Sequence, residues 1–418
     1  MSGNVGEAVN RGLFKQAVEL FTSGRYADAA SALTRAADTG DAEAQNLLGV
    51  MHLNGMSVAQ EPRRSAALFA AAAEQGLKEA RYNLSNLLYN GLGIRRDETR
   101  AQEELLAAAR AGHRPALRSL GYLYHLAGGE ERWQRLSTRC FHIAAEAGDP
   151  LAKYAYGMRL ALGHGTGVDM IAALQWLSAA ARDRVYLAPA RVAELRRRAP
   201  ATTGKSVLAE RGMELEPFDL PRWIAPQPTR SVAFMSEYED ALDPYLCDHL
   251  INTAMPSLEP SGVVDPKTGL GLRSEVRTSY SMSFQASMYD AVVAVSLRRI
   301  AAIAGLPAEH AEPVGVLRYG PGQEYRPHFD FYDDAQHEVQ RVSTVFVYLN
   351  DVAEGGGTEF PRLGVTVEPK RAKAVKFLNC DAAGKPNPET LHAGLPVIRG
   401  EKWLATLWFW DRPFLWFA

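Results

Sequence analysis

The first half of the chain carries a pattern of small and apolar positions that recurs at a fixed spacing. The glycines that mark it are 36 residues apart, at Gly40, Gly76, Gly112 and Gly148. Two alanines precede each glycine, and a further alanine and a large apolar residue follow it. Small alanines let two helices approach closely, and a glycine can end a helix in the left-handed conformation. The pattern therefore predicts an array of antiparallel helix pairs.

The second half shows a different pattern, in which short apolar runs are separated by glycine and proline. Helices are expected near residues 244–254 and 289–304, and strands near 314–319, 342–350, 365–367, 374–379 and 403–410. Short strands joined by tight turns indicate a sandwich or barrel, and a double-stranded jelly roll suits this order. The expected fold is multidomain α and β: an α-helical solenoid followed by a double-stranded β-helix with flanking helices.

This change of pattern predicts the domain organisation. Residues 1–198 form the helical repeat domain, 199–232 a linker and 233–418 a β-rich catalytic domain. The linker contains five prolines and has no sustained period, so we expect it to pack partly on its neighbours.

Composition narrows the class of protein. Apolar residues make up 47% and charged residues 22%, which is the profile of a soluble globular protein. The net charge of −2 gives no reason to expect nucleic acid or an anionic membrane as a partner. Three widely separated cysteines fit a reducing compartment. No signal sequence or transmembrane run is recognisable, so we expect a cytoplasmic protein without membrane contact.

Two residues on one predicted strand are candidates for metal binding. His328 and Asp330 are two positions apart, so their side chains share a face. The pair alone is weak evidence, but His392 supplies a third potential ligand. Two imidazoles and one carboxylate leave open positions on a metal and suit non-haem Fe(II). Zinc is the alternative, because these ligand types do not exclude it.

A lysine near the candidate metal ligands points to a cosubstrate. Lys402 shares a strand face with Leu404, Thr406 and Trp408. A lysine buried without a partner in so apolar a strand would be costly, and a bound dicarboxylate would compensate it. The alternative is a lysine that extends from the strand end to solvent. The nearby triad favours the dicarboxylate.

Both halves resemble known families. The segments "RYGPGQEYRPHFD", "RVSTVFVYLNDVAEGGGTEFP" and "LHAGLPVIRGEKWLATLWF" resemble the prolyl 4-hydroxylase family of 2-oxoglutarate oxygenases, over about residues 233–413. The segment "AEAQNLLGVMHLNGMSV" resembles the Sel1-like subclass of tetratricopeptide repeats, over about residues 25–190.

The first resemblance implies a role for each candidate residue. It places the iron ligands on His328, Asp330 and His392, and the partner of the distal carboxylate of 2-oxoglutarate on Lys402. The further positions it implies are Tyr319 and Thr344 for the cosubstrate, and Tyr325 and Trp408 for the substrate groove. It implies Fe(II) with 2-oxoglutarate and O2 as cosubstrates, and it admits ascorbate as an additional cofactor.

The resemblances together predict a dioxygenase that hydroxylates a proline in a protein or peptide, bound in part by the helical repeats. Residues 262–279 are expected to cover the substrate. One alternative is a 2-oxoglutarate oxygenase that acts on another residue or on a small molecule. Another is an inactive binding scaffold. For the repeats, the alternative is that they only pack on the enzyme or mediate dimerisation.

Overall fold

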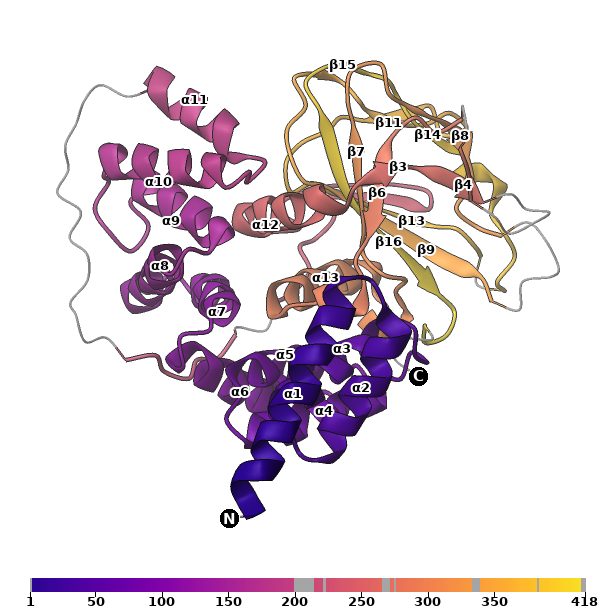
Figure 1. The fold of residues 1–418 in the computed structure, drawn as a ribbon. Helices are drawn as coiled ribbons and strands as arrows, with labels where there is room; N and C mark the ends of the chain where they lie inside the picture. Colours follow the sequence, from indigo (N-terminus) through magenta and orange to yellow (C-terminus); the bar gives the residue numbers. More distant parts are fainter. Residues whose placement is uncertain are drawn as a thin grey trace.

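The computed structural model describes residues 2–198, 214–220, 223–264, 271–273, 276–332, 339–381 and 383–414. Its helical half is a stack of antiparallel helices that follow one another along the chain (Figure 1). Their bounds are α1 (Ser2–Thr22), α2 (Tyr26–Asp38), α3 (Ala42–Asn54), α4 (Pro62–Glu74), α5 (Lys78–Asn90), α6 (Glu98–Arg110), α7 (Arg114–Leu126), α8 (Glu131–Glu146), α9 (Pro150–Leu162), α10 (Met170–Arg182) and α11 (Ala188–Arg198).

Local signals in each repeat explain where these helices begin and end. The four repeating glycines all have positive φ, as predicted, but each follows the residue that caps its helix instead of being the cap itself; Thr39, for example, caps α2 before Gly40. Gly55 and Gly91 end α3 and α5 in the left-handed conformation. Aspartates cap the starts of several helices, for example Asp149, whose carboxylate accepts a hydrogen bond from the Ala152 amide. These caps satisfy backbone groups that a helix end leaves without a partner. The predicted solenoid is confirmed.

The β half is built on two antiparallel sheets that face each other. The large sheet has the order β1-β2-β13-β9-β16-β7-β6-β3, and the smaller one has the order β12-β11-β14-β8. Pairs β4–β5 and β10–β15 lie beside them. The bounds are β1 (Arg230–Val232), β2 (Met235–Tyr238), β3 (Glu259–Pro260), β4 (Gly262–Val264), β5 (Gly271–Arg273), β6 (Tyr280–Ser283), β7 (Gly315–Tyr319), β8 (Tyr325–His328), β9 (Arg341–Tyr348), β10 (Glu354–Gly355), β11 (Thr358–Phe360), β12 (Val365–Val367), β13 (Ala374–Leu378), β14 (His392–Gly394), β15 (Val397–Arg399) and β16 (Lys402–Trp410). This arrangement confirms the double-stranded β-helix.

Two helices of the β half separate its large sheet from the repeats. They are α12 (Pro244–Ala254) and α13 (Ala291–Ala304), which the sequence pattern predicts closely. Figure 1 shows both helices between the sheet and the helical half. Short 3₁₀ turns flank them, η1 (Met255–Ser257), η2 (Ala286–Met288) and η3 (Ala308–His310), and a further turn, η4 (Pro388–Thr390), precedes β14. One continuous apolar core runs from the repeats through α12 and α13 to β9 and β16.

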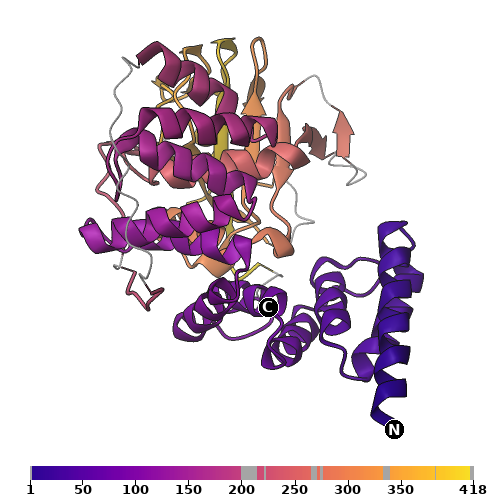
Figure 2. The same ribbon diagram turned by 60° about the vertical axis from the view of Figure 1, so that its left-hand side comes forward.

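The concave side of the repeats is therefore occupied by the chain itself. α13 packs on α5 and α7, and α12 packs on α9. The Tyr154 hydroxyl donates to the Asp248 carboxylate over 2.7 Å, and the Asn90 side chain donates to the Tyr289 carbonyl over 3.0 Å. Along these helices the repeats pack on the enzyme, as the alternative interpretation expected. By contrast, α1 and α2 lie apart from the β half (Figure 2), whereas the end of α3 contacts η2, where the Ser287 amide donates to the Asn54 side chain over 3.4 Å.

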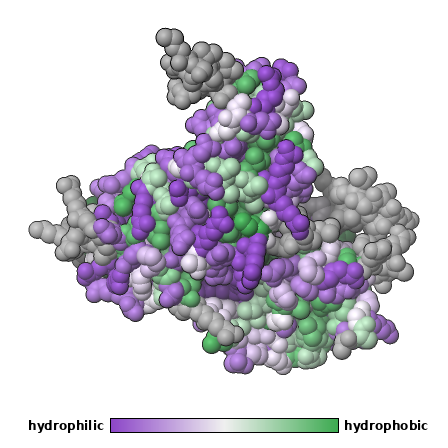
Figure 3. All heavy atoms as spheres, turned by 90° about the horizontal axis from the view of Figure 1, so that it is seen from below, coloured by the Kyte–Doolittle hydropathy of each residue, from purple (hydrophilic) through white to green (hydrophobic). Residues whose placement is uncertain are grey.

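Hydrophilic residues predominate over the surface seen in Figure 3, with smaller hydrophobic areas between them. Among the described residues, no helix combines the length and the apolar character that crossing a bilayer requires.

The predicted linker, residues 199–232, is partly ordered against both halves. Residues 214–220 pack on the repeats, and the last three residues of the linker form β1, which pairs with β2 in the large sheet. Of the predicted covering loop, residues 265–270 and 274–275 lie outside the described residues.

Candidate active site

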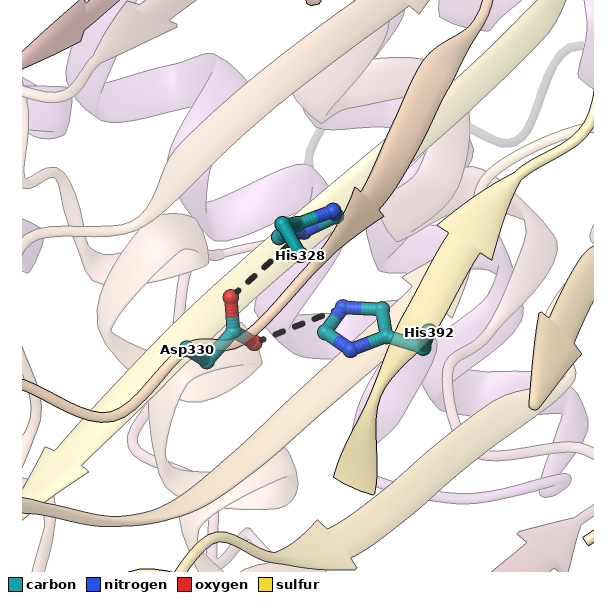
Figure 4. A group of neighbouring side chains, drawn as sticks. All are labelled: His328, Asp330 and His392. Carbon is teal, nitrogen blue, oxygen red and sulfur yellow. Dashed lines mark ion pairs between the residues drawn. The ribbon is translucent and has the colours of Figure 1, made fainter. Parts of the chain in front are cut away.

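The three candidate metal ligands meet where the two strands β8 and β14 pair. His328 and His392 are directly opposite each other in this pairing, and Asp330 follows β8. The ligand atoms of all three side chains lie within 4.8 Å of one another. Figure 4 shows both imidazoles directed toward the carboxylate. One oxygen of Asp330 is 3.8 Å from His328 Nε2, and the other is 3.8 Å from His392 Nε2.

Backbone hydrogen bonds determine which nitrogen of each histidine can bind a metal. His328 Nδ1 is 2.9 Å from the Arg326 carbonyl, and His392 Nδ1 is 3.0 Å from the Thr390 carbonyl. A carbonyl only accepts, so Nδ1 carries the proton and Nε2 has the free lone pair. Burial and the neighbouring His392 lower the pKa of His328 to about 3, so its ring is neutral at neutral pH. Neutral imidazole is the form that binds metals.

A chain of hydrogen bonds holds the carboxylate in place. Asp330 accepts from the Thr344 hydroxyl over 2.8 Å, and Thr344 in turn accepts from the Asn379 side chain over 2.9 Å. Burial would raise the pKa of Asp330, but the neighbouring imidazoles, Arg341 and the Thr344 hydroxyl outweigh it and hold the pKa below its usual value. The carboxylate is therefore ionised and oriented in the absence of any metal.

Lys402 lies in the same cavity and is fully buried. Its ammonium group has no hydrogen-bond partner among the described residues. It lies 4.5 Å from the centre of the Tyr319 ring. Burial lowers its pKa to about 7. The alternative of a lysine that reaches solvent is therefore wrong, because the strand end lies inside the barrel.

The strand β16 lines one wall of this cavity with alternate residues. Lys402, Leu404, Thr406 and Trp408 all face it, as the period of two predicted. The remaining lining residues are Arg277, Leu317, Tyr319, Tyr325, His328, Asp330, Thr344, Phe346, Thr358, His392 and Gly394. Every candidate residue from the sequence is thus present.

Aromatic and cationic side chains form the mouth of the cavity. The Tyr325 ring stacks on His328, with centroids 3.5 Å apart. The Arg277 guanidinium lies 4.9 Å from the Tyr325 ring, and that of Arg341 lies 4.2 Å from the Trp408 ring. Each of the two rings is thus packed against a guanidinium group, an arrangement in which the cation and the ring attract each other.

Sequence reasoning missed three contributors. Asn379 orients Thr344, Arg277 lies over Tyr325, and Gly394 leaves room for Lys402, because a Cβ at Gly394 would come within 3.2 Å of the ammonium nitrogen. Thr344 also differs from expectation, since its hydroxyl binds Asp330; its contact with a cosubstrate stays a prediction. Arg277 lies within residues 262–279, the segment expected from the sequence to cover the substrate, so its place near the cavity had a usable signal. For Asn379 the sequence held no such signal, because its partners depend on which strands pair in the sheet.

The residues present fit both Fe(II) and a dicarboxylate. Two Nε2 lone pairs and one ionised carboxylate on one side of a cavity leave several metal positions open, as non-haem iron oxygenases require. The buried ammonium of Lys402 lacks a counter-charge, which a second carboxylate would supply.

Comparison with known proteins agrees with this chemistry. Residues 314–410 match the model of the 2OG-Fe(II) oxygenase superfamily, and residues 42–77, 78–113, 114–149 and 150–183 match the Sel1 repeat. Prolyl 4-hydroxylase 5 of Arabidopsis thaliana is 38% identical over 199 residues, which are 42% of this chain and 68% of that protein. The chain spans about two thirds of the length of such relatives.

Two solved structures are similar to one half each. A viral collagen prolyl hydroxylase of Paramecium Bursaria Chlorella virus-1, in complex with 2OG, is 30% identical, with a TM-score of 0.35 over 43% of this chain and 97% of that one. A protective antigen of uropathogenic Escherichia coli with an SLR fold is 26% identical, with a TM-score of 0.42 over 47% of this chain and 43% of that one.

Proposed function

Because this chain belongs to the prolyl 4-hydroxylase family of Fe(II)- and 2-oxoglutarate-dependent dioxygenases, we propose that it hydroxylates a prolyl residue in a protein or peptide. One observation carries the chemical part of this proposal. The buried ammonium of Lys402 has no hydrogen-bond partner in the part of the chain that the structure describes, and it faces the same cavity as the His328, Asp330 and His392 group. A cavity that holds a metal triad and an unpaired cation suits a metal-chelating dicarboxylate.

In the proposed reaction each side chain has a separate task. His328, Asp330 and His392 would hold Fe(II), and Lys402 would pair with the distal carboxylate of 2-oxoglutarate. When bound, this pair supplies the oxidation, in which O2 and 2-oxoglutarate become succinate, CO2 and a hydroxyl group on the substrate. The protein orients the ligands through Thr344 and excludes water with its apolar walls. None of its side chains needs to act as an acid or base.

A prolyl substrate is supported by the relatives and by the mouth of the cavity. Relatives named prolyl 4-hydroxylase share 36–39% of their aligned residues with this chain. Tyr325 and Trp408 both line the cavity, and aromatic side chains offer a large apolar surface against which a proline ring can pack. We propose these two residues as contacts for the target proline and its neighbours.

The test couples turnover to product analysis. The full chain, loaded with Fe(II), should convert 2-oxoglutarate to succinate faster when proline-containing peptides are present. Mass spectrometry should then find one added oxygen atom on a proline. The His328→Ala variant should give neither signal, whereas substitution of the exposed Lys385 should leave both unchanged.

Each alternative has its own outcome in this experiment. An oxygen found only on other residues, or turnover driven only by small molecules, would replace prolyl hydroxylation by the broader oxygenase activity. Absence of turnover in a metal-loaded, folded chain would leave a binding scaffold. Recruitment of the substrate by the repeats is also a proposal. Such recruitment would have to use α1–α4 or those helices of the repeats that do not pack on α12 and α13, because α12 and α13 cover α5, α7 and α9.

A further inference from the structure

The connection between the two halves of the chain takes an indirect path. Just before α11, the chain already touches the β half: the Tyr186 hydroxyl bonds Glu401, and the Leu187 amide donates to Asn252 over 3.0 Å. The next described residues, 214–220, nevertheless lie back along the solenoid, across α6, α7 and α8. Only afterwards does the chain reach β1.

Side chains of the repeats recognise the backbone of this segment. The Tyr124 hydroxyl accepts from the Glu216 amide over 3.0 Å and donates to the Glu216 carbonyl over 2.7 Å. The Gln102 side chain does the same for Phe218, accepting over 3.2 Å and donating over 2.7 Å. Arg110 donates to the Leu215 carbonyl over 2.6 Å. Glu216 and Phe218, two residues apart, are thus each held through both of their backbone groups.

Two side chains of the segment fit complementary positions on the repeats. Phe218 is buried against the rings of Tyr124 and Trp133, with centroids 4.9 Å and 6.4 Å away. The Glu216 carboxylate pairs with the Arg132 guanidinium, whose Nε lies 2.6 Å away. That guanidinium also lies over the Trp133 ring. The site therefore accommodates a carboxylate and, two residues later, an aromatic ring.

Backbone pairing at alternate residues combined with side-chain pockets is how proteins bind extended peptides in general. A segment that serves only as a covalent connection needs neither feature, and a direct connection from α11 to β1 would avoid this detour. The contacts between residues 214–220 and the repeats are of the same kinds as those between an extended peptide and the protein that binds it.

The segment leaves part of its binding site empty. A cavity of about 420 Å³ lies beside it, lined by Tyr89, Glu98, Thr99 and Gln102 together with Pro217 to Leu220. Asp219 and Glu98 both border this cavity, so acidic side chains line it from the segment and from α6. A foreign peptide with a large or cationic residue at the Asp219 position would gain contacts that the native segment lacks. The foreign peptide needs such a gain, because residues 214–220 are tethered and compete for the groove at an effective concentration on the order of millimolar.

We propose that the groove formed by α6, α7 and α8 is a peptide-binding site, that residues 214–220 occupy it in cis, and that a partner protein bearing an extended Glu-x-aromatic segment binds there by displacing them. The site lies outside the cavity of the proposed reaction, and its function does not depend on that reaction.

The test uses the full chain and a fluorescent peptide with the sequence of residues 212–222. A Glu216→Ala, Phe218→Ala double variant removes the side-chain contacts of the tethered segment and so weakens its competition for the groove. It should bind the peptide, measured by anisotropy, at least tenfold more tightly than the wild-type chain does. The Asp219→Arg version of the peptide should bind several-fold more tightly still. Adding Tyr124→Phe to the double variant keeps the ring but removes two hydrogen bonds, so it should weaken binding about tenfold. Adding Gln75→Ala, a change of an exposed residue outside the groove, should not.

Two results would overturn the proposal. One is a folded double variant that binds neither peptide at about millimolar concentration. The other is binding that Tyr124→Phe leaves unchanged. If the double variant does not fold, the displacement of residues 214–220 can be tested by hydrogen exchange in the wild-type chain. A saturating amount of the Asp219→Arg peptide should speed exchange of the Glu216 and Phe218 amides, and unchanged exchange would contradict displacement.

Discussion

Replacing Lys402 with methionine should make the ligand-free protein more stable while abolishing the binding of 2-oxoglutarate. The ammonium group is buried without a hydrogen-bond partner, so the folded state bears the cost of a desolvated charge. Methionine has a similar length and carries no charge. A residue kept for stability alone would behave in the opposite way.

The size of the effect follows from the pKa of Lys402. Burial lowers this pKa from 10.5 to about 7. A difference of about 3.5 pH units at about 1.4 kcal/mol each amounts to about 5 kcal/mol. The contact with the Tyr319 ring returns about 1–2 kcal/mol, so the variant should gain about 3 kcal/mol. For a domain of this size, that gain raises the unfolding midpoint by on the order of 10 °C.

The gain should depend on pH in a defined direction. Lysine is charged in both states below about pH 7, so the full cost of burying the charge is present there. Between about pH 7 and 10.5 the folded state loses the proton first, and the cost falls as the pH rises. The advantage of the variant should therefore be largest near pH 6.5 and should shrink toward pH 10.

Thermal unfolding of the full chain at several pH values measures this advantage, with and without 2-oxoglutarate and Mn(II). In the presence of Mn(II), 2-oxoglutarate should stabilise the wild-type chain and leave the Lys402→Met variant unaffected. Lys385→Met serves as the control, because Lys385 is exposed and should change neither quantity. A Lys402→Met variant that is less stable than wild type near pH 6.5, or equally stable at every pH, would refute the unpaired buried charge.

Three further predictions concern the site and the contact between the two halves. The affinity of the wild-type chain for 2-oxoglutarate, measured by calorimetry with Mn(II) bound, should fall above about pH 7, by up to about tenfold per pH unit, because Lys402 must take up a proton to bind the anion. Asn379→Ala should weaken metal binding about tenfold in a metal titration, since Thr344 loses the donor that fixes its orientation toward Asp330; an unchanged affinity would remove Asn379 from the site. Tyr154→Phe should lower the free energy of unfolding by about 1–2 kcal/mol in calorimetry without changing metal affinity, since it removes one buried hydrogen bond between repeats and β half; coupled losses would contradict that separation.

Much of the active site was predictable because its signals are local. The period of a strand brings Lys402 and Trp408 onto one face of β16. The same period led us to place His328 and Asp330 on one strand; their side chains do meet, but β8 ends at His328 and Asp330 lies in the bend that follows. The left-handed glycines of the repeats could also be read directly from their spacing. Such patterns depend on backbone geometry within a few residues, so the sequence alone specifies them.

The contributors that the sequence did not reveal act across distant segments. Asn379 reaches Asp330 only because β13 and β9 are neighbours in the large sheet, and Thr344 is thereby turned toward the carboxylate. The histidines face each other because β14 pairs with β8 in that register.

The sequence by itself determined the two kinds of fold, the types of candidate metal ligand and the 36-residue repeat. Only the tertiary structure decided how the halves meet. A repeat pattern shows that helices stack, but it does not show what covers the concave side, because that depends on the shape and polarity of α12 and α13. The position of residues 214–220 on α6–α8 is likewise a matter of complementary surfaces far apart in the chain. Periodicity specifies each element, whereas packing between elements specifies the surfaces that remain for partners.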